Sequence, residues 1–115
     1  MSENTECLFC RIVAGNVPAE VVKQTDRVLA FRDVNPQAPT HVLVIPRAHH
    51  RNVTEVAAAA PETLAEMVLV GDEIARAAGH DAYRLVFNTG AEAGQSVFHV
   101  HGHVVAGRRL TWPPG

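Results

Sequence analysis

The 115-residue sequence predicts an α+β fold, with about five mainly antiparallel strands, one short helix and one long helix. Two observations indicate this class. Five short segments are rich in β-branched and aromatic residues, and one long segment repeats apolar residues every three or four positions. The helical segments stand before the first strand and between the third and fourth strands, an order that favours an antiparallel sheet.

The first half of the chain predicts a short helix followed by three strands. Residues 7–14, CLFCRIVA, place Leu8 and Ile12 on one side of a helix, which Gly15 and Asn16 end. The strands are expected at residues 19–24, 28–34 and 41–46, with a tight turn before the second and an irregular connection at 35–40 before the third. The third strand, HVLVIP, is mostly β-branched and is expected at the centre of the sheet.

The second half predicts one long helix and two further strands. Pro61 suits the first turn of a helix, and Gly79 suits its left-handed end. The apolar stripe between them consists of Leu64, Met67, Val68, Gly71, Ile74, Ala75 and Ala78. The last two strands are expected at 82–88 and 96–106, joined by a loop at 89–95, and the tail 107–115 shows no regular pattern.

Length and charge exclude several classes of protein. A chain of this length forms one domain, residues 1–115, in which we expect residues 1–6 to be a flexible N-terminus. Its net charge of −2 provides no extended positive electrostatic field for binding nucleic acid or a membrane. No window approaches the roughly 18 apolar residues of a membrane span, and the start lacks the features of a signal peptide. We therefore expect a cytoplasmic location.

Cys7 and Cys10 form a CxxC pair at the expected first helix. In a reducing compartment this spacing indicates a redox dithiol or half of a metal site more than a structural disulfide. It is equally compatible with two small apolar side chains packed on one face of the helix.

Three of the seven histidines lie within five residues, in GQSVFHVHGHVV at 94–105. On a strand, His99, His101 and His103 would share one face and follow each other at about 6.6–6.8 Å. Val100 and Val104 would take the opposite face. Gly102, between them, indicates close approach of another backbone or helix.

This row of histidines has three interpretations. It could be an exposed strand without a specific function, a metal site completed by a third ligand, or a site for phosphoryl chemistry. Imidazole is a nucleophile and an acid–base group near neutral pH, and neighbouring imidazoles would titrate as a coupled set sharing one proton. The preceding loop GAEAGQS, with its glycines and Ser96, can present N–H groups to an anion and favours the third interpretation.

These motifs together resemble the histidine-triad superfamily, and within it the histidine-triad nucleotide-binding (Hint) branch. HVHGHVV resembles the signature His-φ-His-φ-His-φ-φ, where φ is hydrophobic, and AFRDVNPQAPTHVLVIPRAHH and WPPG also match in order. The resemblance covers about residues 7–115. Gly102 departs from the signature, and Phe98 stands where many relatives have Tyr. The resemblance implies a HIT-like fold and a homodimer.

The resemblance also implies an enzyme that hydrolyses nucleoside 5′-monophosphate amides and esters, notably purine nucleoside phosphoramidates and also aminoacyl adenylates. His101 would attack the α-phosphorus and form a nucleotidyl-histidine that water then hydrolyses. His99 and His103 would flank the phosphate. His41 would support the triad, although it equally suits a residue at the start of a strand that bonds to backbone. The implied ligand is a nucleotide of the AMP or GMP type, and catalysis would need no cofactor.

The implied nucleotide site draws on several segments. Asn88 and Ser96 match phosphate-contacting residues, and Asp33 matches a ribose-binding residue, although Asp33 also suits a turn before Asn35. Other residues implied to line the site are Leu8, Phe9, Ile12, Phe31, Val34, Gly94, Gln95 and Val97, and the apolar ones suit an ordinary core as well. Trp112, in the tail 107–115 near the dimer interface, would shape the leaving-group side of the partner subunit's site or else dock on its own subunit.

Some bacterial relatives hold a structural zinc ion through residues that correspond here to Cys7, Cys10, His49 and His99. His50, next to His49, is a second candidate for one ligand. Three other functions stay open: a dinucleoside polyphosphate hydrolase, a nucleotide-binding regulatory protein with incidental turnover, and a zinc-binding structural module. The WPPG tail and GQSVFHVH favour the Hint branch over the polyphosphate hydrolases.

Overall fold

The computed structural model describes residues 6–115, so the expected flexible segment 1–6 lies, except for Glu6, outside the described residues. The helices are α1 (Leu8–Val13), α2 (Val53–Ala59) and α3 (Pro61–Ala77), with a short 3₁₀ turn η1 (Ala91–Ala93). The strands are β1 (Val21–Gln24), β2 (Val28–Arg32), β3 (Thr40–Pro46), β4 (Tyr83–Phe87) and β5 (Gly102–Ala106).

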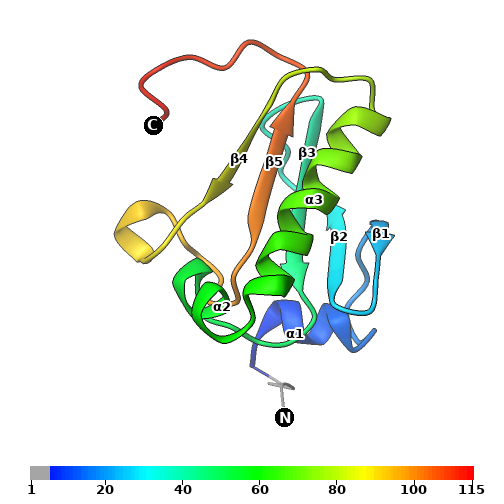
Figure 1. The fold of residues 1–115 in the computed structure, drawn as a ribbon, viewed down its shortest axis with the longest axis vertical. Coiled ribbons are helices and arrows are strands. Elements are labelled where there is room, and N and C mark those ends of the chain that lie inside the picture. The colour runs from blue at the N-terminus through cyan, green and yellow to red at the C-terminus, as the bar shows by residue number, and fades with distance from the viewer. Residues whose placement is uncertain (1–5) are drawn as a thin grey trace.

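The five strands form one sheet in the order β1-β2-β3-β5-β4, and every neighbouring pair is antiparallel (Figure 1). The predicted α+β class and the five-stranded antiparallel sheet are therefore confirmed. β3 is buried along its whole length, as its β-branched composition predicts for a central strand. Because β5 lies between β3 and β4, its histidine, His103, lies on an interior strand of the sheet.

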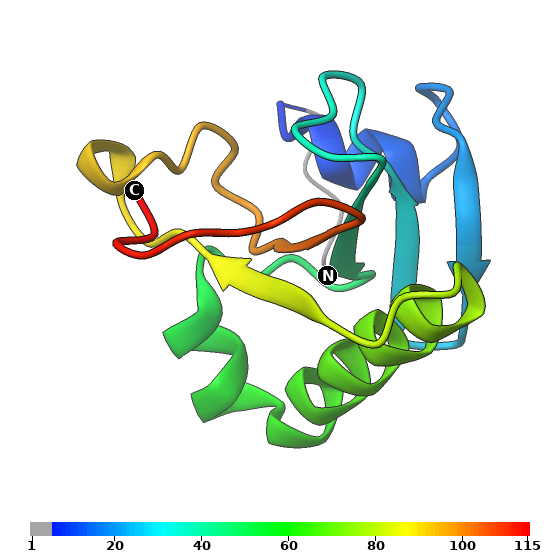
Figure 2. The ribbon, with the colours of Figure 1, turned by 90° about the horizontal axis from the view of Figure 1, so that it is seen from above.

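Helices cover the two faces of the sheet unequally: α2 and α3 lie on one face, and α1 lies on the other (Figure 2). Alternation along β2 divides the core, since Val28 and Ala30 face α3 whereas Leu29 and Phe31 face α1. At Gly71 of α3 an added Cβ would stand 3.2 Å from Val104, so glycine brings this helix close to β5. Among residues 6–115, no helix has the length and apolar character needed to span a membrane.

The expectation of only two helices is wrong, because α2 was not predicted. Asn52 caps its start by accepting a hydrogen bond from the Glu55 N–H at 2.9 Å, and Glu55 accepts one from the Arg51 N–H at 2.6 Å. This Asn-x-x-Glu spacing, followed by an alanine run, is the signal that predicts a helix start.

The expected strand at 96–106 is also wrong in its first half, because β5 begins only at Gly102. Gly102 pairs with Val44, and Pro46, the last residue of β3, has no N–H with which to extend this ladder. Its carbonyl instead lies 2.8 Å from Nε2 of His99, and the Val100 N–H donates to the carbonyl of His50 at 2.8 Å. Side-chain and loop hydrogen bonds therefore replace the sheet where His99 and His101 lie.

Gly102 is approached closely by side chains of the neighbouring strand, and not by another backbone or helix as predicted. An added Cβ would lie 2.9 Å from Phe87 and 3.0 Å from Leu85, both on β4. The space that a hydrophobic residue takes in the family signature is thus filled here from the neighbouring strand.

Candidate active site

The side chains of the three histidines lie on the same side of the segment 99–103, although only His103 belongs to a regular strand. The Phe9 ring of α1 makes edge contacts with His99 and His101, at centroid distances of 6.0 and 5.1 Å. The rings of His101 and His103 are 5.0 Å apart. Val100 and Val104 pack in the core on the α3 side. The predicted alternation of faces therefore holds.

Backbone contacts fix the tautomer of His101. Its Nδ1 lies 2.9 Å from the carbonyl oxygen of His99. A carbonyl only accepts, so Nδ1 carries the proton and donates it. In the neutral ring, Nε2 then keeps its lone pair and is free to act as a nucleophile.

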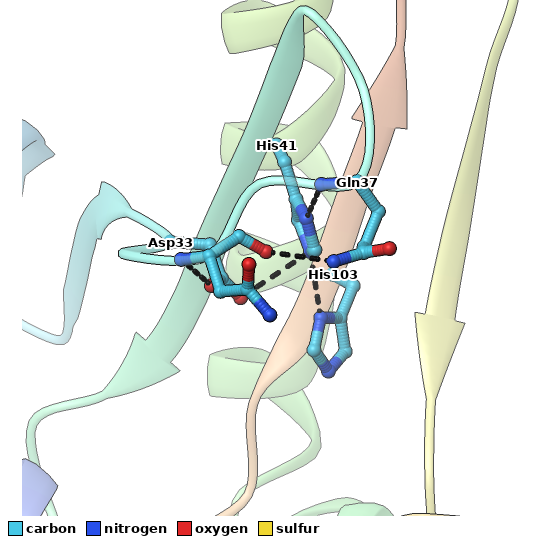
Figure 3. Close-up of polar contacts among 5 residues, drawn as sticks. Asp33, Gln37, His41 and His103 are labelled. Atoms are coloured by element: carbon cyan, nitrogen blue, oxygen red, sulfur yellow. Dashed lines mark hydrogen bonds and ion pairs between the residues drawn. The ribbon is translucent and has the colours of Figure 1, made fainter.

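His41 links the loop before β3 to His103 (Figure 3). The Gln37 N–H donates to His41 Nδ1 at 3.0 Å, so the neutral His41 carries its proton on Nε2. That nitrogen lies 2.9 Å from His103 Nδ1 and 3.4 Å from an Asp33 carboxylate oxygen. His103 therefore accepts at Nδ1 and carries its own proton on Nε2. His41 therefore bonds to backbone, as one of its two interpretations predicts, and it also contacts His103.

Asp33 and Gln37 belong to the same loop. The other Asp33 carboxylate oxygen accepts the Asn35 N–H at 2.8 Å, which is the turn that the sequence suggests as one interpretation (Figure 3). Gln37 was not singled out from the sequence, because its contribution to His41 comes from a backbone N–H and not from its side chain.

Burial keeps the row of histidines neutral. Desolvation lowers the pKa of His103 to about 4, with smaller contributions from neighbouring His101 and His41. Desolvation also lowers the pKa of His101, and the hydrogen bond to the His99 carbonyl and nearby Asp33 only partly oppose this. The expected sharing of one proton near neutral pH is therefore not supported, and the site has uncharged nitrogens available for nucleophilic attack.

A cavity of about 240 Å³ lies beside the His41–His103 pair. Its lining consists of Gln37, His41, Arg84, Val86, Asn88, His103, Val105, Arg108, Leu110 and Pro114. Asn88 therefore lies in the same cavity as His103. Arg84 was missed, although Arg84 and Val86 alternate along β4 and so share a face, and Asn88 follows directly after the strand. Arg108 was missed because the tail shows no pattern that predicts where it folds.

The loop before the histidines is held by Gln95, which is 3% exposed. Its side chain accepts the Gly90 N–H at 2.8 Å and donates to the carbonyls of Arg51 and Val97 at 2.8 and 3.1 Å. Gly94, with φ at 100°, takes a left-handed conformation that favours glycine. These two residues shape the loop. Ser96 is exposed and lines a second cavity, of about 380 Å³, with Cys7 and His49.

The apolar candidates lie in different environments. Phe31 is buried, with its ring 5.4 Å from that of Phe9 in an edge contact. Ile12 and Val97 pack partly buried against the same cluster, whereas Leu8 and Val34 are exposed. Trp112 is 81% exposed, so it does not dock on its own subunit.

The structure gathers Cys7, Cys10, His49 and His99 so that one ligand atom of each lies within 4.8 Å of the others. His99 Nδ1 lies 3.4 and 3.5 Å from the Cys7 and Cys10 sulfurs, and His49 Nδ1 lies 3.3 Å from Cys10. Tetrahedral zinc would separate a sulfur and a nitrogen ligand by about 3.6 Å. Because Nε2 of His99 donates to the Pro46 carbonyl, Nδ1 is left as the lone-pair atom. The donor set fits zinc.

Comparison with known proteins gives concordant results. Residues 14–110 match the HIT domain family. The chain is 42% identical over 107 residues to the purine nucleoside phosphoramidase of Escherichia coli (strain K12), covering 91% of this chain and 90% of that protein. A HIT family hydrolase from Legionella pneumophila Philadelphia 1 superposes with a TM-score of 0.91 at 46% identity, covering 95% of this chain and 99% of the other. A zinc-bound histidine triad family protein from Mycobacterium smegmatis has a TM-score of 0.81 at 38% identity, with 96% and 81% covered.

Proposed function

Because the chain belongs to the HIT domain family, we propose that it is a purine nucleoside phosphoramidate hydrolase of the Hint branch. The observation that carries this proposal is the orientation of His101, whose Nδ1–H is fixed on the His99 carbonyl and whose Nε2 is left as a nucleophile. Similarity over most of the chain to a purine nucleoside phosphoramidase supports the choice of substrate class.

The first chemical step is attack by His101 Nε2 on the α-phosphorus. The new P–N bond forms as the bond to the amine breaks. The leaving nitrogen takes up one proton from solvent and departs as a neutral amine, while the His101 ring becomes positively charged. His103 carries the Nε2–H that can hydrogen-bond this nitrogen, since its Nδ1 is occupied by His41. The His99 carbonyl stabilises the positive charge that develops on the His101 ring.

The second step is attack by water on the nucleotidyl-histidine. It forms the P–O bond of the nucleoside monophosphate, breaks the P–N bond to His101, releases to solvent one proton, equal to the one taken up in the first step, and restores the neutral ring. We assign Asn88 to the phosphate because it lines the cavity together with His103 and its amide is a neutral donor. Asp33 is proposed to accept hydrogen bonds from the ribose hydroxyls, with Phe31 and its neighbours on the α1 face beside the base.

We also propose a structural zinc ion on Cys7, Cys10, His49 and His99, and a zinc-bound relative supports this assignment. When bound, zinc would cross-link α1 to the segment that carries His99. His99 then has a positioning role, since its backbone carbonyl orients His101. The protein is further proposed to be a cytoplasmic homodimer, in which a partner subunit covers the exposed Trp112.

The proposal is tested by steady-state release of amine from a fluorogenic adenosine 5′-phosphoramidate. Turnover of this compound with formation of AMP is the expected result. Release of AMP from a dinucleoside polyphosphate, but not from the phosphoramidate, would favour the polyphosphate hydrolase instead. Tight binding of AMP without turnover of either compound would favour a regulatory nucleotide-binding protein.

The pH dependence of turnover follows from the neutral state of His101. Protonation of Nε2 removes the lone pair, so the rate falls as the pH drops through the pKa of this ring. Because desolvation lowers the pKa of His101 below its ordinary value of 6.5, we expect the acid limb of kcat/KM to have its midpoint below pH 6.5. A midpoint at or above 6.5 in the pH–rate profile would contradict this assignment.

A further inference from the structure

The cavity beside His103 carries positive charge that the proposed hydrolysis does not use. Arg84 of β4 and Arg108 of the tail both line it, and no carboxylate is among its lining residues. Arg84 is partly buried and Arg108 is exposed. The cavity therefore carries two guanidinium groups without an acidic residue in its wall.

Both guanidinium groups are held in place by backbone carbonyls. Arg84 Nη2 donates to the Thr111 carbonyl at 3.0 Å. Arg108 donates from Nε to the Gln37 carbonyl at 2.8 Å and from Nη1 to the Arg109 carbonyl at 3.1 Å. A guanidinium has five N–H groups, so each arginine keeps donors for a ligand. Within residues 6–115, neither arginine forms an ion pair with a carboxylate.

The two arginines line the same cavity as the side chain that is proposed to contact the leaving amine. His103, whose Nε2–H is proposed to meet the amine nitrogen, is part of the same cavity wall. Substituents of that amine therefore extend towards Arg84 and Arg108. A volume of about 240 Å³ holds about eight water-sized groups, which is room for an amino acid or a single phosphate.

We propose that Arg84 and Arg108 select leaving groups that carry an anion close to the scissile nitrogen. Substrates of this class are nucleotides linked through phosphorus to an amine that bears a carboxylate or a phosphate group. The inference rests on the proposed hydrolase function and adds a specificity-determining pair to it. Planar guanidinium groups recognise both anions through paired N–H donors, so the charge and not the shape of the anion is the shared feature.

The test compares adenosine 5′-phosphoramidates of glycine and glycinamide, which are nearly equal in size and differ in charge. We expect the wild-type kcat/KM to favour the glycine compound by about tenfold, as for one partly exposed charge-assisted contact. Arg84→Gln and Arg108→Gln should each reduce this preference, and the double variant should abolish it. The matched control is Arg109→Gln, since this exposed neighbour is not part of the cavity wall. A preference that survives in the double variant would overturn the proposal.

Two further arms separate the possible outcomes. The aminomethylphosphonate analogue replaces the carboxylate by a phosphate-like group. Its kcat/KM, compared with that of the glycine compound, shows which anion the arginines prefer. Dissociation constants of the three compounds, measured with His101→Ala, test the arginine pair without turnover. Equal affinity for glycine and glycinamide compounds would overturn the arginine proposal, whereas absent turnover in the wild type with unequal affinities would overturn only the hydrolase.

Discussion

Replacing His101 by alanine is expected to lower turnover of an adenosine 5′-phosphoramidate by at least about a thousandfold, while AMP still binds. The variant loses the proposed nucleophile, the Nε2 that the His99 carbonyl leaves unprotonated. Side chains assigned to the phosphate and ribose are unchanged. Amine release and equilibrium AMP binding, measured on the same preparation, check the two parts of this expectation.

His80→Ala is the matched control for that variant. His80 is a partly buried histidine that bonds Thr40 through Nε2 at 3.0 Å and has no contact with the row of histidines. Its replacement should leave turnover within a small factor of the wild type. If His101→Ala retained most of the activity, the nucleotidyl-histidine mechanism on this residue would be wrong.

Removal of zinc is expected to have the second large effect, on stability. A ligand present at about a thousand times its dissociation constant stabilises the folded state by about 4 kcal/mol. Because the four donors join α1 to the segments that carry His49 and His99, chelation should lower the unfolding temperature clearly. Zinc content per chain and thermal unfolding with and without a chelator provide the measurement.

Cys10→Ser and Cys10→Ala distinguish this explanation from ordinary packing. Both variants should bind less zinc, and their unfolding temperature should no longer respond to the chelator. If the two cysteines only pack as small apolar side chains, the wild type would contain no zinc and Cys10→Ala would cost little stability. Finding that pattern would overturn the zinc assignment and leave the hydrolase proposal intact.

The parts of the fold that the sequence predicts well are those in which local pattern and burial agree. The apolar stripe of α3 and the β-branched run of β3 each specify one buried face, so both elements lie close to their expected positions. Residues 96–101 show the opposite case. Their alternation predicts a strand, but Pro46 cannot continue the ladder, and Val100 bonds to the loop carbonyl of His50 instead.

The candidate site likewise has features that local sequence predicts and features that only the fold determines. Side-chain identities in the HVHGHVV and CxxC motifs are readable from the sequence, because the chemistry depends on residue type and spacing. The tautomers of His41 and His101 depend on a backbone N–H and a backbone carbonyl, which any residue could provide. Arg108 reaches the cavity only because the tail folds back towards Gln37, a contact between distant segments that no local pattern encodes.

The stereochemical course at phosphorus tests the central claim most directly, since it does not require the intermediate to accumulate. A phosphoramidate made chiral by sulfur and hydrolysed in oxygen-labelled water gives a product whose configuration can be assigned. Attack by His101 followed by attack by water inverts phosphorus twice, so the account predicts overall retention. Overall inversion would show a single direct displacement by water and would contradict a covalent nucleotidyl-histidine.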